Sequence, residues 1–483
     1  MRKIVRALVA GSVCVLSGCL VGPRYQRPVV TAPAVSRGQV TAEAASLADL
    51  PWWEVFQDET LRGLIQTALA NNNDLRIAVK RVEQSRQLAV QAHAEYMPGV
   101  GYEVGISQGK NESLGNPAGS SGKWQGTLAL GLAASWEADV WGRIRRLNES
   151  ALANYLASEQ GHRGVLLSLV SGVAQSYLEL LELDLRVEIA RRNVKSFEGS
   201  RGIFQQRLEG GTASRLETAR AEGALAVTAS AIPELERQIA IQENGMHLLL
   251  GSAPGPIARQ GTLLEHTIPP QVPAGLPSAL LERRPDVLRA EQAVRAANAQ
   301  IGIVQASFFP RIGLTTLLGR ASSPLEDFTG GRTNVWSTAA SLVGPIYEGR
   351  GLRAQKRQAV AAWEQARIEY EQTVLAAFRD VSNALITREK LEAVRARQME
   401  AVTAFQSAVE VSQQRYMAGK SGYFEVLEAQ QQLVPAENAL AQTELDRRLV
   451  IVQLYQALGG GWKLSDAEWN GPAPGSATAA PKR

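Results

Sequence analysis

The chain of 483 residues has only four histidines and two cysteines, side chains that many catalytic and metal sites use. Its four histidines show no metal-ligand spacing, no phosphate-binding loop is present, and no GxSxG nucleophile motif follows a predicted strand. The sequence therefore predicts no catalytic residue, no metal site and no cofactor. Each histidine is interpreted as a surface or packed residue rather than a ligand: His93, His162, His247 and His266.

Cysteine is rarer still, with two in the whole chain. Cys14 lies in an N-terminal stretch that starts basic, becomes apolar and ends in the letters LSGC. Because the apolar part is far shorter than the roughly 20 residues of a transmembrane helix, we expect 1–18 to be a secretory signal. Cys19 is then the only cysteine left after cleavage, which excludes an intramolecular disulfide.

The end of this signal resembles the lipobox of bacterial lipoproteins, in which a cysteine becomes the first mature residue and carries lipid. The resemblance implies that Cys19 is a lipid attachment site, whose acyl chains tether the protein to a membrane. The segment 19–51 is rich in Pro, Val, Thr and Ala and is expected to be an extended, lipid-anchored leader. An unmodified free cysteine is the alternative.

The net charge gives no support to a nucleic-acid-binding protein, and the lack of long hydrophobic runs argues against transmembrane helices. The formal net charge of +4 falls to +1 when Arg2, Lys3 and Arg6 leave with the signal, so the basic balance gives no argument for nucleic-acid binding. After the signal, no stretch approaches 18 consecutive apolar residues, and no transmembrane helix is expected. If this chain spans a membrane, strands must do so.

The chain has, instead, two copies of one layout. Asp74 to Pro98 and Asp286 to Pro310 each span 24 positions and begin 212 residues apart, and the Gln-Gln-Arg frames at Gln205 and Gln413 are 208 apart. A period near 210 residues is far longer than the units of solenoid proteins, so each copy is a domain-sized layout.

The predicted boundaries follow from this duplication. We expect a first structural repeat over 52–265 and a second over 266–461, each running helix, β-hairpin, long helix, helix. The tail, 462–483, is expected to be disordered.

Alternation of apolar and polar residues predicts one β-hairpin in each copy, over about 99–137 and about 311–345. Each predicted strand has the length that a tilted strand needs to cross a bilayer, about ten residues. Polar stretches rich in turn formers separate the strands of each hairpin and predict tips that face water. Trp136 and Trp336, near strand ends, are typical of a membrane girdle.

The rest of the chain is predicted to be helical. Residues 142–208 can form one helix near 100 Å long at about 1.5 Å per residue. Two adjacent apolar stripes on it predict neighbours on both sides, as in a ring of helices, although a four-helix bundle satisfies them too. Pro233 and Pro435 are expected to kink helices or to mark a junction between stacked short helices. The stripes consist of Leu166, Val170, Val173, Tyr177 and Leu180, and of Leu167, Ala174 and Leu181.

Four strands cannot close a barrel, and an open sheet in lipid leaves edge N–H and C=O groups unsatisfied. The protomer must therefore share strands with copies of itself. Two, three or four copies would supply about 8, 12 or 16 strands, and the smallest barrel would be filled by its own side chains. Three copies are the fewest that leave a lumen, so a homotrimer is expected.

With these features the chain resembles the TolC-like outer-membrane efflux channels, or outer membrane factors. It is most similar to the lipoprotein NodT-type branch, which is partnered with resistance-nodulation-division (RND) pumps. The resemblance covers nearly all of the mature chain. It is carried by GCLVGPRYQRP at Cys19, WW with FQDETLRGLI at Trp52, DVWGRIRR at Asp139, LLERRPDVLRAEQAV at Leu280, ASFFPRIGL at Ala306, GPIYEGRGLRA at Gly344, RYMAGKSGYFEVLEAQ at Arg415 and LYQALGGGW at Leu454.

The resemblance implies a mixed α/β membrane protein, internally duplicated, whose homotrimer forms a 12-stranded outer-membrane β-barrel continuous with a 12-helix periplasmic α-barrel. It implies a channel that catalyses nothing and passively exports drugs, toxic compounds or metals. Its implied partners are an inner-membrane RND-type pump, a periplasmic adaptor (membrane fusion) protein and outer-membrane lipid. A belt around the helices is implied near 251–277. The alternative is a periplasmic scaffold or adaptor lipoprotein without a pore, against which the four alternating segments count.

Two turns between helices, 207–214 and 415–422, are implied to form the periplasmic tips that meet the adaptor. Their glycines are expected at positive φ, and their hydroxyl side chains are available as helix caps. The residues expected to bind the adaptor are Gly210, Gly211, Thr212, Ser214, Gly419 and Ser421.

The family places its closed constriction just after the second tip, at positions that correspond to Phe424, Glu425 and Glu428. Glu425 and Glu428 are three residues apart and share a helix face, and three-fold symmetry would turn each into an acidic ring that favours cations. Tyr416 and Arg415 are implied as tethers of the closed state. From the residues alone, the two glutamates are interpreted as a solvated helix face.

Overall fold

The computed structural model describes residues 20–34, 37, 46–110, 124–211, 214–265, 275, 277–322 and 334–472. Three residues singled out by the sequence, Cys19, Thr212 and His266, lie outside these described residues. The chain divides into two compact units. The first consists of Met1–Val29, Arg81–Glu159 and Arg289–Glu371, and the second of Val30–Lys80, Gln160–Leu288 and Gln372–Arg483.

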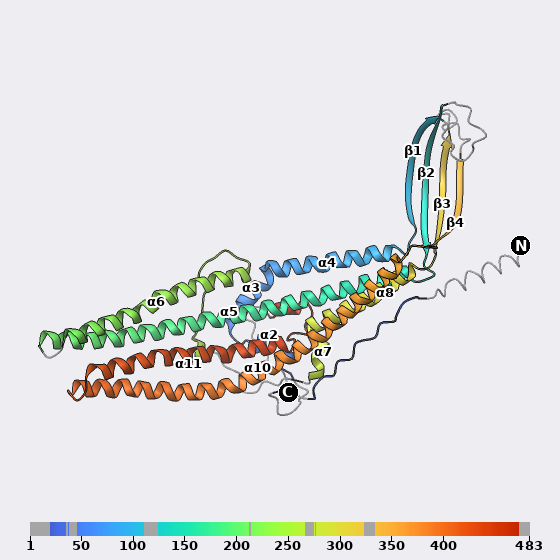
Figure 1. Ribbon diagram of the computed structural model, residues 1–483. Coiled ribbons are helices and arrows are strands. Elements are labelled where there is room, and N and C mark those ends of the chain that lie inside the picture. The colour runs from blue at the N-terminus through green and yellow to red at the C-terminus, as the bar shows by residue number, and fades with distance from the viewer. Residues whose placement is uncertain are drawn as a thin grey trace. The chain divides into compact units, whose positions relative to one another are not determined.

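Long helices dominate the chain (Figure 1). Helices α5 (Arg143–Glu209) and α10 (Gly351–Met417) have 67 residues each and begin 208 positions apart. Helices α6 (Arg215–Leu250) and α11 (Tyr423–Ala457) follow them, and their starts are also 208 positions apart. The long helix predicted over 142–208 is therefore observed, and the duplication holds for the helix starts. The remaining helices are η1 (Leu47–Asp49), α2 (Trp52–Val55), α3 (Glu59–Asn71), α4 (Asn73–Ala94), η2 (Leu263–Glu265), η3 (Pro277–Ala279), α7 (Leu280–Arg283), α8 (Pro285–Ala306) and η4 (Glu468–Asn470).

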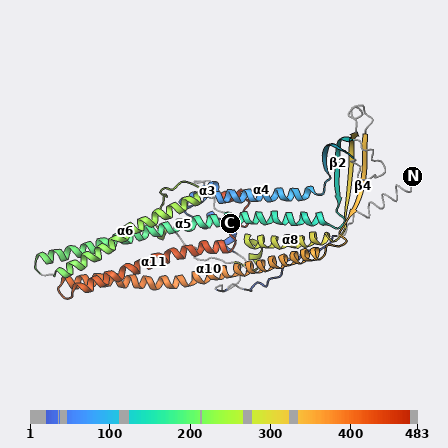
Figure 2. The same cartoon turned by 45° about the horizontal axis from the view of Figure 1, so that its top comes forward.

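In the second unit, four helix segments lie side by side in the order α6, α5, α11, α10 (Figures 1 and 2). Helices α5 and α6 are joined by one tip and α10 and α11 by the other, so each pair is antiparallel. The free edges of this layer within one chain are therefore α6 and α10.

The expected junction at each proline is not found. Pro233 lies inside α6 and Pro435 inside α11, and both helices continue through the proline. Each proline is exposed, so its ring lies on the side of the helix that no neighbour occupies. A proline removes one backbone hydrogen bond, and packing of the turns on either side holds the helix together.

Both apolar stripes predicted on α5 are buried within the single chain. Their eight side chains have exposed fractions between 0% and 4%. Among the described helices, α5 also meets the length and composition expected of a membrane-crossing helix: one 18-residue window has a mean hydropathy of 1.4, and 67% of that window is buried. Polar residues interrupt this window, so it contains no long run of consecutive apolar residues.

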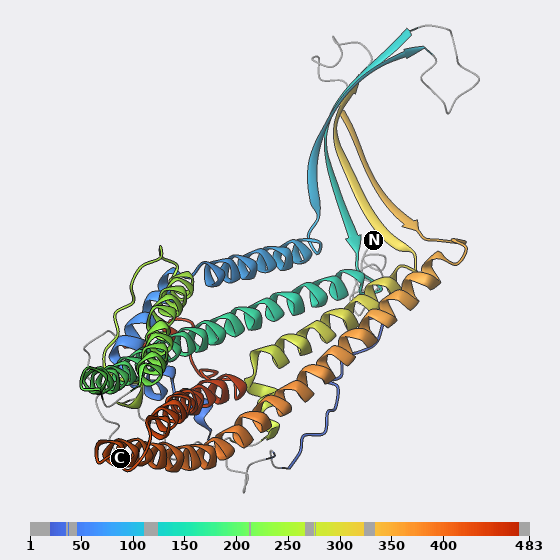
Figure 3. The same cartoon turned by 60° about the vertical axis from the view of Figure 1, so that its left-hand side comes forward.

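The first unit contains a four-stranded antiparallel sheet in the order β1-β2-β3-β4. The strands are β1 (Gly99–Lys110), β2 (Trp124–Ala138), β3 (Arg311–Ser322) and β4 (Asn334–Val343), which lie where the alternation predicts them. Figure 3 shows the four strands bending together along their length. Within the described residues, β1 and β4 each pair on one side only.

The register gives the sheet two chemically different faces. Tyr102, Leu132, Leu318 and Trp336 lie in one row across the four strands, and Tyr102 and Trp336 are 81% and 76% exposed. The next row, on the opposite face, consists of Glu103, Gly131, Gly319 and Val335. Large apolar side chains on one face and small or polar ones on the other are the pattern of a strand between lipid and water.

The start of the leader, at Val21 to Pro23, is held by hydrogen bonds within the first unit. Arg146 of α5 is 2% exposed and donates hydrogen bonds to the carbonyl oxygens of Val21, Gly22 and Pro23 at 2.9 to 3.2 Å. Gly22 has φ +96°, and a Cβ there would lie 2.5 Å from Cα of Gly302 in α8. Only glycine fits this close approach, so the residues directly after Cys19 have a defined path along α5 and α8.

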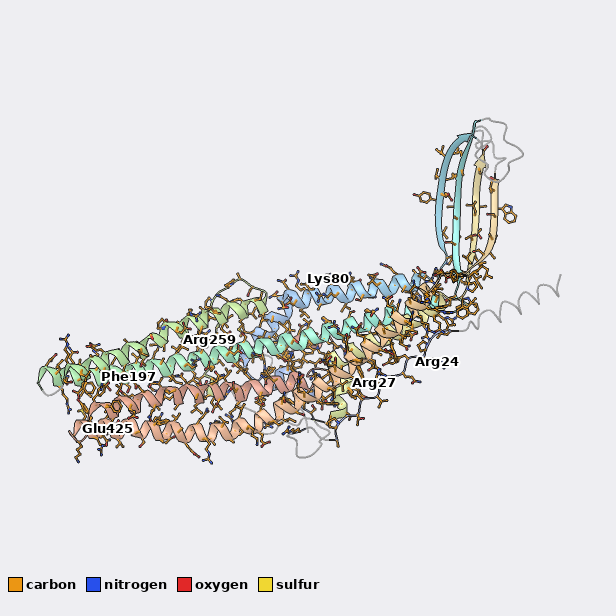
Figure 4. The ribbon with its side chains drawn as sticks, viewed as in Figure 1. Arg24, Arg27, Lys80, Phe197, Arg259 and Glu425 are labelled. Carbon is orange, nitrogen blue, oxygen red and sulfur yellow. The ribbon has the colours of Figure 1, made fainter. Side chains whose placement is uncertain are left out.

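The segments around Trp52 and Trp469 and the segment between the copies pack in the second unit. Trp52 Nε1 donates to the carbonyl oxygen of Trp469 at 2.9 Å, which joins the N-terminal and C-terminal segments. Arg259, labelled in Figure 4, pairs with Asp184 of α5 at 2.7 Å and with Glu243 of α6 at 2.6 Å. Burial raises the pKa of Asp184, and the Arg259 charge acts against that rise. One arginine thus fastens the inter-copy segment to two helices.

Replacing Arg259 with alanine is expected to lower the free energy of unfolding by about 1–3 kcal/mol, because Asp184 and Glu243 lose a charged hydrogen-bond partner. Thermal unfolding in detergent, followed by helical circular dichroism, measures this change. The control is Arg191→Ala: Arg191 is 65% exposed and its pair with Glu236 is 3.5 Å long. Equal losses in the two variants would contradict the assignment of Arg259 as a fastening residue.

Candidate functional site

The first tip is closed by a glycine and a capping box. Gly211 has φ +71° and ends the turn after α5, whereas its neighbour Gly210 does not have positive φ. One left-handed residue is enough to reverse the chain after a helix. Ser214 is the N-cap of α6: its hydroxyl accepts from Glu217 N at 3.4 Å, and the Glu217 carboxylate accepts from Ser214 N at 2.9 Å. Ser214 therefore caps a helix as expected.

The second tip is built differently. Gly419 has φ +69°, and Lys420 N donates to the carbonyl oxygen of Arg415 at 2.8 Å, which closes the end of α10. The N-cap of α11 is Gly422, and no side chain caps the helix. The expectation that Ser421 caps α11 is wrong, because Ser421 lies one residue too early. Its hydroxyl is buried without a hydrogen-bond partner among the described residues.

The first turns of α11 have two faces. Phe424 is 62% exposed, the Glu425 side chain is 51% exposed, and Glu428 is exposed as well. Tyr423 and Val426 are each 2% exposed and point into the protein. The structure therefore brings the three expected constriction residues onto one exposed helix face at the tip end of α11. Glu425 is labelled there in Figure 4.

An aromatic cluster lies beneath this face and joins the four long helix segments of the second unit, α5, α6, α10 and α11. The ring of Phe204 on α5 is 3.9 Å from that of Tyr423 and 5.1 Å from that of Tyr416, between centroids. Arg207 lies over the Tyr416 ring at 4.3 Å. We call this group the tip cluster; its buried members are Phe197, Phe204, Ala221, Tyr416, Tyr423, Val426 and Leu427.

The two expected tethers have different environments. Tyr416 is 6% exposed and belongs to the tip cluster, so its ring is a core side chain. Arg415 Nε lies 3.7 Å from Glu425 Oε2, and both side chains are about half exposed. An ion pair this open to water contributes little to stability. It does connect the end of α10 to the constriction face of α11.

Buried polar residues on α11 are a feature that the apolar stripes did not reveal. Gln430 Nε2 donates to Ser196 Oγ and Ser200 Oγ on α5 at 2.9 and 3.0 Å. Seven residues on, the Glu437 carboxylate accepts from Arg192 at 2.8 Å and Asn193 at 2.9 Å. We call these two groups the polar layers. Their signal in the sequence is the seven-residue spacing of polar residues on an otherwise buried helix face.

A further heptad on, Glu444 is also buried and pairs with Arg447 and Arg448 of its own helix and with Arg395 of α10. Burial alone would raise the pKa of Glu444. Hydrogen bonds and charge from the three arginines outweigh that effect, and the pKa is lowered. The carboxylate therefore stays ionised inside the helical layer.

A groove of about 780 Å³ runs between α6 and α11 near the tips. Phe197 of α5 forms part of its wall (Figure 4), together with Val227 of α6 and Val434 of α11. The described residues contain no group of three or more His, Cys, Asp or Glu arranged to hold a metal ion. The tips thus offer an apolar groove and an exposed acidic face.

Known proteins share this architecture. The model of the outer membrane efflux protein family matches residues 64–252 and 276–460. The chain is 32% identical over 452 residues to the cation efflux system protein CusC of Escherichia coli O6:H1, covering 93% of this chain and 97% of CusC. It is 33% identical over 467 residues to the toluene efflux pump outer membrane protein TtgI of Pseudomonas putida, covering 95% and 99%. The solved structure of the outer-membrane channel OprN has 30% identity and a TM-score of 0.86, covering 92% of this chain and 100% of that one.

A duplicated chain of long paired helices with two hairpins in one sheet defines an outer-membrane channel protein. The chain belongs to the outer membrane efflux protein family. The resemblance identified from the sequence motifs is therefore confirmed, as are the efflux function and the outer-membrane location. Its relatives are channels rather than enzymes.

Replacing Tyr423 with phenylalanine is expected to raise stability by about 1 kcal/mol, because its hydroxyl is buried without a hydrogen-bond partner among the described residues. Burial, and then the neighbouring Tyr416, raise the pKa of Tyr423 to about 12, so the group is an uncharged phenol. The matched variant is Tyr455→Phe, which removes a hydrogen bond of 3.3 Å to Leu50 O and should lower stability by a similar amount. Thermal unfolding of both variants measures whether stability rises in Tyr423→Phe and falls in Tyr455→Phe. A fall in the stability of Tyr423→Phe would show that the Tyr423 hydroxyl has a hydrogen-bond partner.

Proposed function

We propose that this protein is the outer-membrane channel of a tripartite efflux system and that it acts as a homotrimer. The observation that carries the proposal is the sheet of four strands with β1 and β4 unpaired on their outer sides among the described residues. Three such sheets joined edge to edge form a 12-stranded β-barrel, with the apolar rows toward lipid and the small rows toward water. Closure satisfies every edge hydrogen bond, which lipid cannot do.

The helices follow the same three-fold arrangement. Each chain presents four helix segments side by side, so three copies make a 12-helix α-barrel that extends into the periplasm. Ile346, just after the last strand, is an apolar side chain that is 103% exposed in the single chain, as expected of a surface that meets a second copy.

The working cycle needs no chemistry from the channel. An inner-membrane RND-type pump delivers small molecules through a periplasmic adaptor, which docks on the tips around Gly210, Gly211, Thr212, Ser214, Gly419 and Ser421. The groove between α6 and α11 supports such docking, because its lining is largely apolar and reaches Phe424, two residues after the second tip. The related proteins are named for cations and for toluene, so drugs, toxic compounds and metals all remain candidate cargo.

We further propose that Phe424, Glu425 and Glu428 form the resting constriction. Three copies would place six carboxylates around the axis, and their mutual repulsion in a narrow bore would be relieved by bound cations. Arg415 would hold Glu425 from the neighbouring helix of its own chain. We retain the division into a signal (1–18), a leader (19–51), two repeats (52–265 and 266–461) and a tail (462–483).

Planar-bilayer recording of the purified protein tests the channel directly. A trimer with a through-bore gives open-pore current, at least after the constriction is widened. A scaffold or adaptor lipoprotein gives none in any variant, and that result would overturn the proposal.

The double substitution Glu425→Ala and Glu428→Ala is expected to raise resting conductance several-fold and to weaken block by divalent cations, because the acidic ring is removed. Single-channel recording with and without Mg²⁺ measures both effects. The control is Glu400→Ala, which removes an exposed glutamate of α10 paired with Arg397. Unchanged conductance and unchanged block in the double variant would place the ring elsewhere.

Replacing Cys19 with serine is expected to abolish lipid attachment, because the thiol is the group that carries the lipid in lipoproteins with this signal. Mass spectrometry of the intact mature protein reads this out as loss of the lipid mass. The control is Cys14→Ser, inside the predicted signal, which should leave the mature mass unchanged. Retention of lipid in Cys19→Ser would show that the anchor lies at another residue.

A further inference from the structure

Each copy leaves the sheet through a short connection into a long helix, and both connections lie in the first unit. Strand β2 ends at Ala138 and α5 begins at Arg143, whereas β4 ends at Val343 and α10 begins at Gly351. Neither helix has an acidic residue in its first turn, and both carry cations there. Because the N-terminal end of a helix is electropositive, cations at this end are unfavourable unless an anion lies close by.

The three arginines at the start of α5 have such an anion within the chain. Each lies within 3.2 Å of a carboxylate oxygen. The first of these junctions is therefore electrostatically satisfied by its own residues. The pairs are Arg143 with Glu137, Arg145 with Asp139, and Arg146 with Glu149.

The start of α10 carries four cations that have no such partner. Among the described residues, none of their side chains forms an ion pair or a hydrogen bond. No acidic residue lies between Glu348 and Glu364, so this stretch has a local charge of +4. Three of the four side chains are exposed and Lys356 is half-buried. The cations are Arg350, Arg353, Lys356 and Arg357.

These cations lie just beyond the sheet. Tyr347, which is 87% exposed, stands in the chain between the last strand residue, Val343, and Arg350. Aromatic side chains are typical of the boundary between lipid and water. Figure 3 shows α10 (orange) beginning at the same end of the sheet as α5 (teal). At about 1.5 Å per residue, Arg350 to Arg357 extend about 10 Å along the helix, which is close to the reach of a surface charge at about 0.1 M salt.

We propose that the start of α10 is a binding surface for anionic phospholipid headgroups at the periplasmic face of the outer membrane. Arg350, Arg353 and Arg357 are three and four residues apart and share one side of the helix. Each guanidinium donates two parallel N–H bonds to phosphate oxygens. The inference rests on the proposed β-barrel, because it takes the end of β4 as the surface of the bilayer.

A membrane surface fits these cations better than a second copy of the chain does. Helix α4 contains four cations and two carboxylates, and α8 contains two of each. Neither helix therefore offers a surplus of negative charge to α10 of another copy. An anionic lipid surface supplies that charge, and attraction to it does not require one fixed register of side chains.

Lipid binding by the purified protein in a non-ionic detergent tests the proposal. The protein is titrated with phosphatidylglycerol and, separately, with zwitterionic phosphatidylcholine, and native mass spectrometry measures the bound lipid. The unsubstituted protein is expected to bind phosphatidylglycerol at least about five-fold more tightly. The triple variant Arg350→Gln, Arg353→Gln, Arg357→Gln should lose this preference, and high salt should reduce it in the unsubstituted protein. A triple variant that keeps the preference would overturn the proposal.

The matched control removes three exposed cations of the second unit: Lys195→Gln, Arg201→Gln and Arg215→Gln. This variant has the same change in net charge and should keep the preference for phosphatidylglycerol. An equal loss in the control would show that total charge, and not the start of α10, attracts the lipid. Inorganic phosphate at the concentration of the lipid should not displace it, and displacement would refute a lipid surface in favour of a small-anion site.

Molecular mass in lipid-free detergent separates this proposal from its alternatives. A triple variant that is monomeric, beside a trimeric control, would show that the cations pair with a second copy and would refute the lipid surface. Unsubstituted trimers without a preference for phosphatidylglycerol would also refute it and would leave the channel standing. Monomers of the unsubstituted protein would refute the proposed trimer, and with it the barrel on which this inference rests.

Discussion

Unpaired backbone groups at the edges of the sheet are the constraint from which the rest of this architecture follows. A strand in lipid has no water to satisfy its N–H and C=O groups, so β1 and β4 must be joined to other strands. The chain supplies four strands and, through the same connections, two long helices and their shorter partners. The number of copies that closes the sheet therefore also fixes the number of helices around the bore. The number of copies that closes the sheet in the membrane therefore determines how many helices the periplasmic part contains.

Duplication gave two equivalent tips, and they have since diverged at one position in a way that matters for the site. In the first tip Ser214 caps α6, and Glu217 completes the capping box. In the second tip Gly422 stands at the position of Ser214, and Glu425 stands at the position of Glu217. Gly422 has no hydroxyl with which to form a capping box. The carboxylate of Glu425 instead lies 3.7 Å from Arg415 Nε on the exposed face. One hydroxyl thus separates a glutamate that completes a capping box from a glutamate whose carboxylate faces Arg415 on the helix surface.

Much of the fold was predictable because it depends on local patterns. Alternation located the four strands, and the absence of breakers located the long α5, whose two apolar stripes are buried as expected. The failures have different causes. Ser421 was expected as a cap, but cap position depends on where the turn ends, and a one-residue difference moved it to Gly422. Pro233 and Pro435 were expected to kink helices or to mark a junction between short helices, and the junction is absent because α6 and α11 each continue through the proline.

The candidate site was predictable only in part, because the sequence marks which residues share a helix face and not which of them are covered. Spacing alone placed Glu425 and Glu428 together. Burial of Tyr416 depends on Phe204, more than 200 residues away, and no local pattern contains that contact.

The polar layers help to determine which helix packs against α5 and in which alignment. Apolar seams alone would hold α5 against almost any amphipathic neighbour, including the copy of its true partner that duplication created. Burying Gln430 and Glu437 costs solvation that their hydrogen bonds largely return, so the layers add little net stability. Their effect is that any other alignment of α5 and α11 leaves buried polar groups without hydrogen bonds, which costs free energy. Because duplication produced two similar helices, α6 and α11, this cost helps α5 to select the correct partner face more than additional apolar area would.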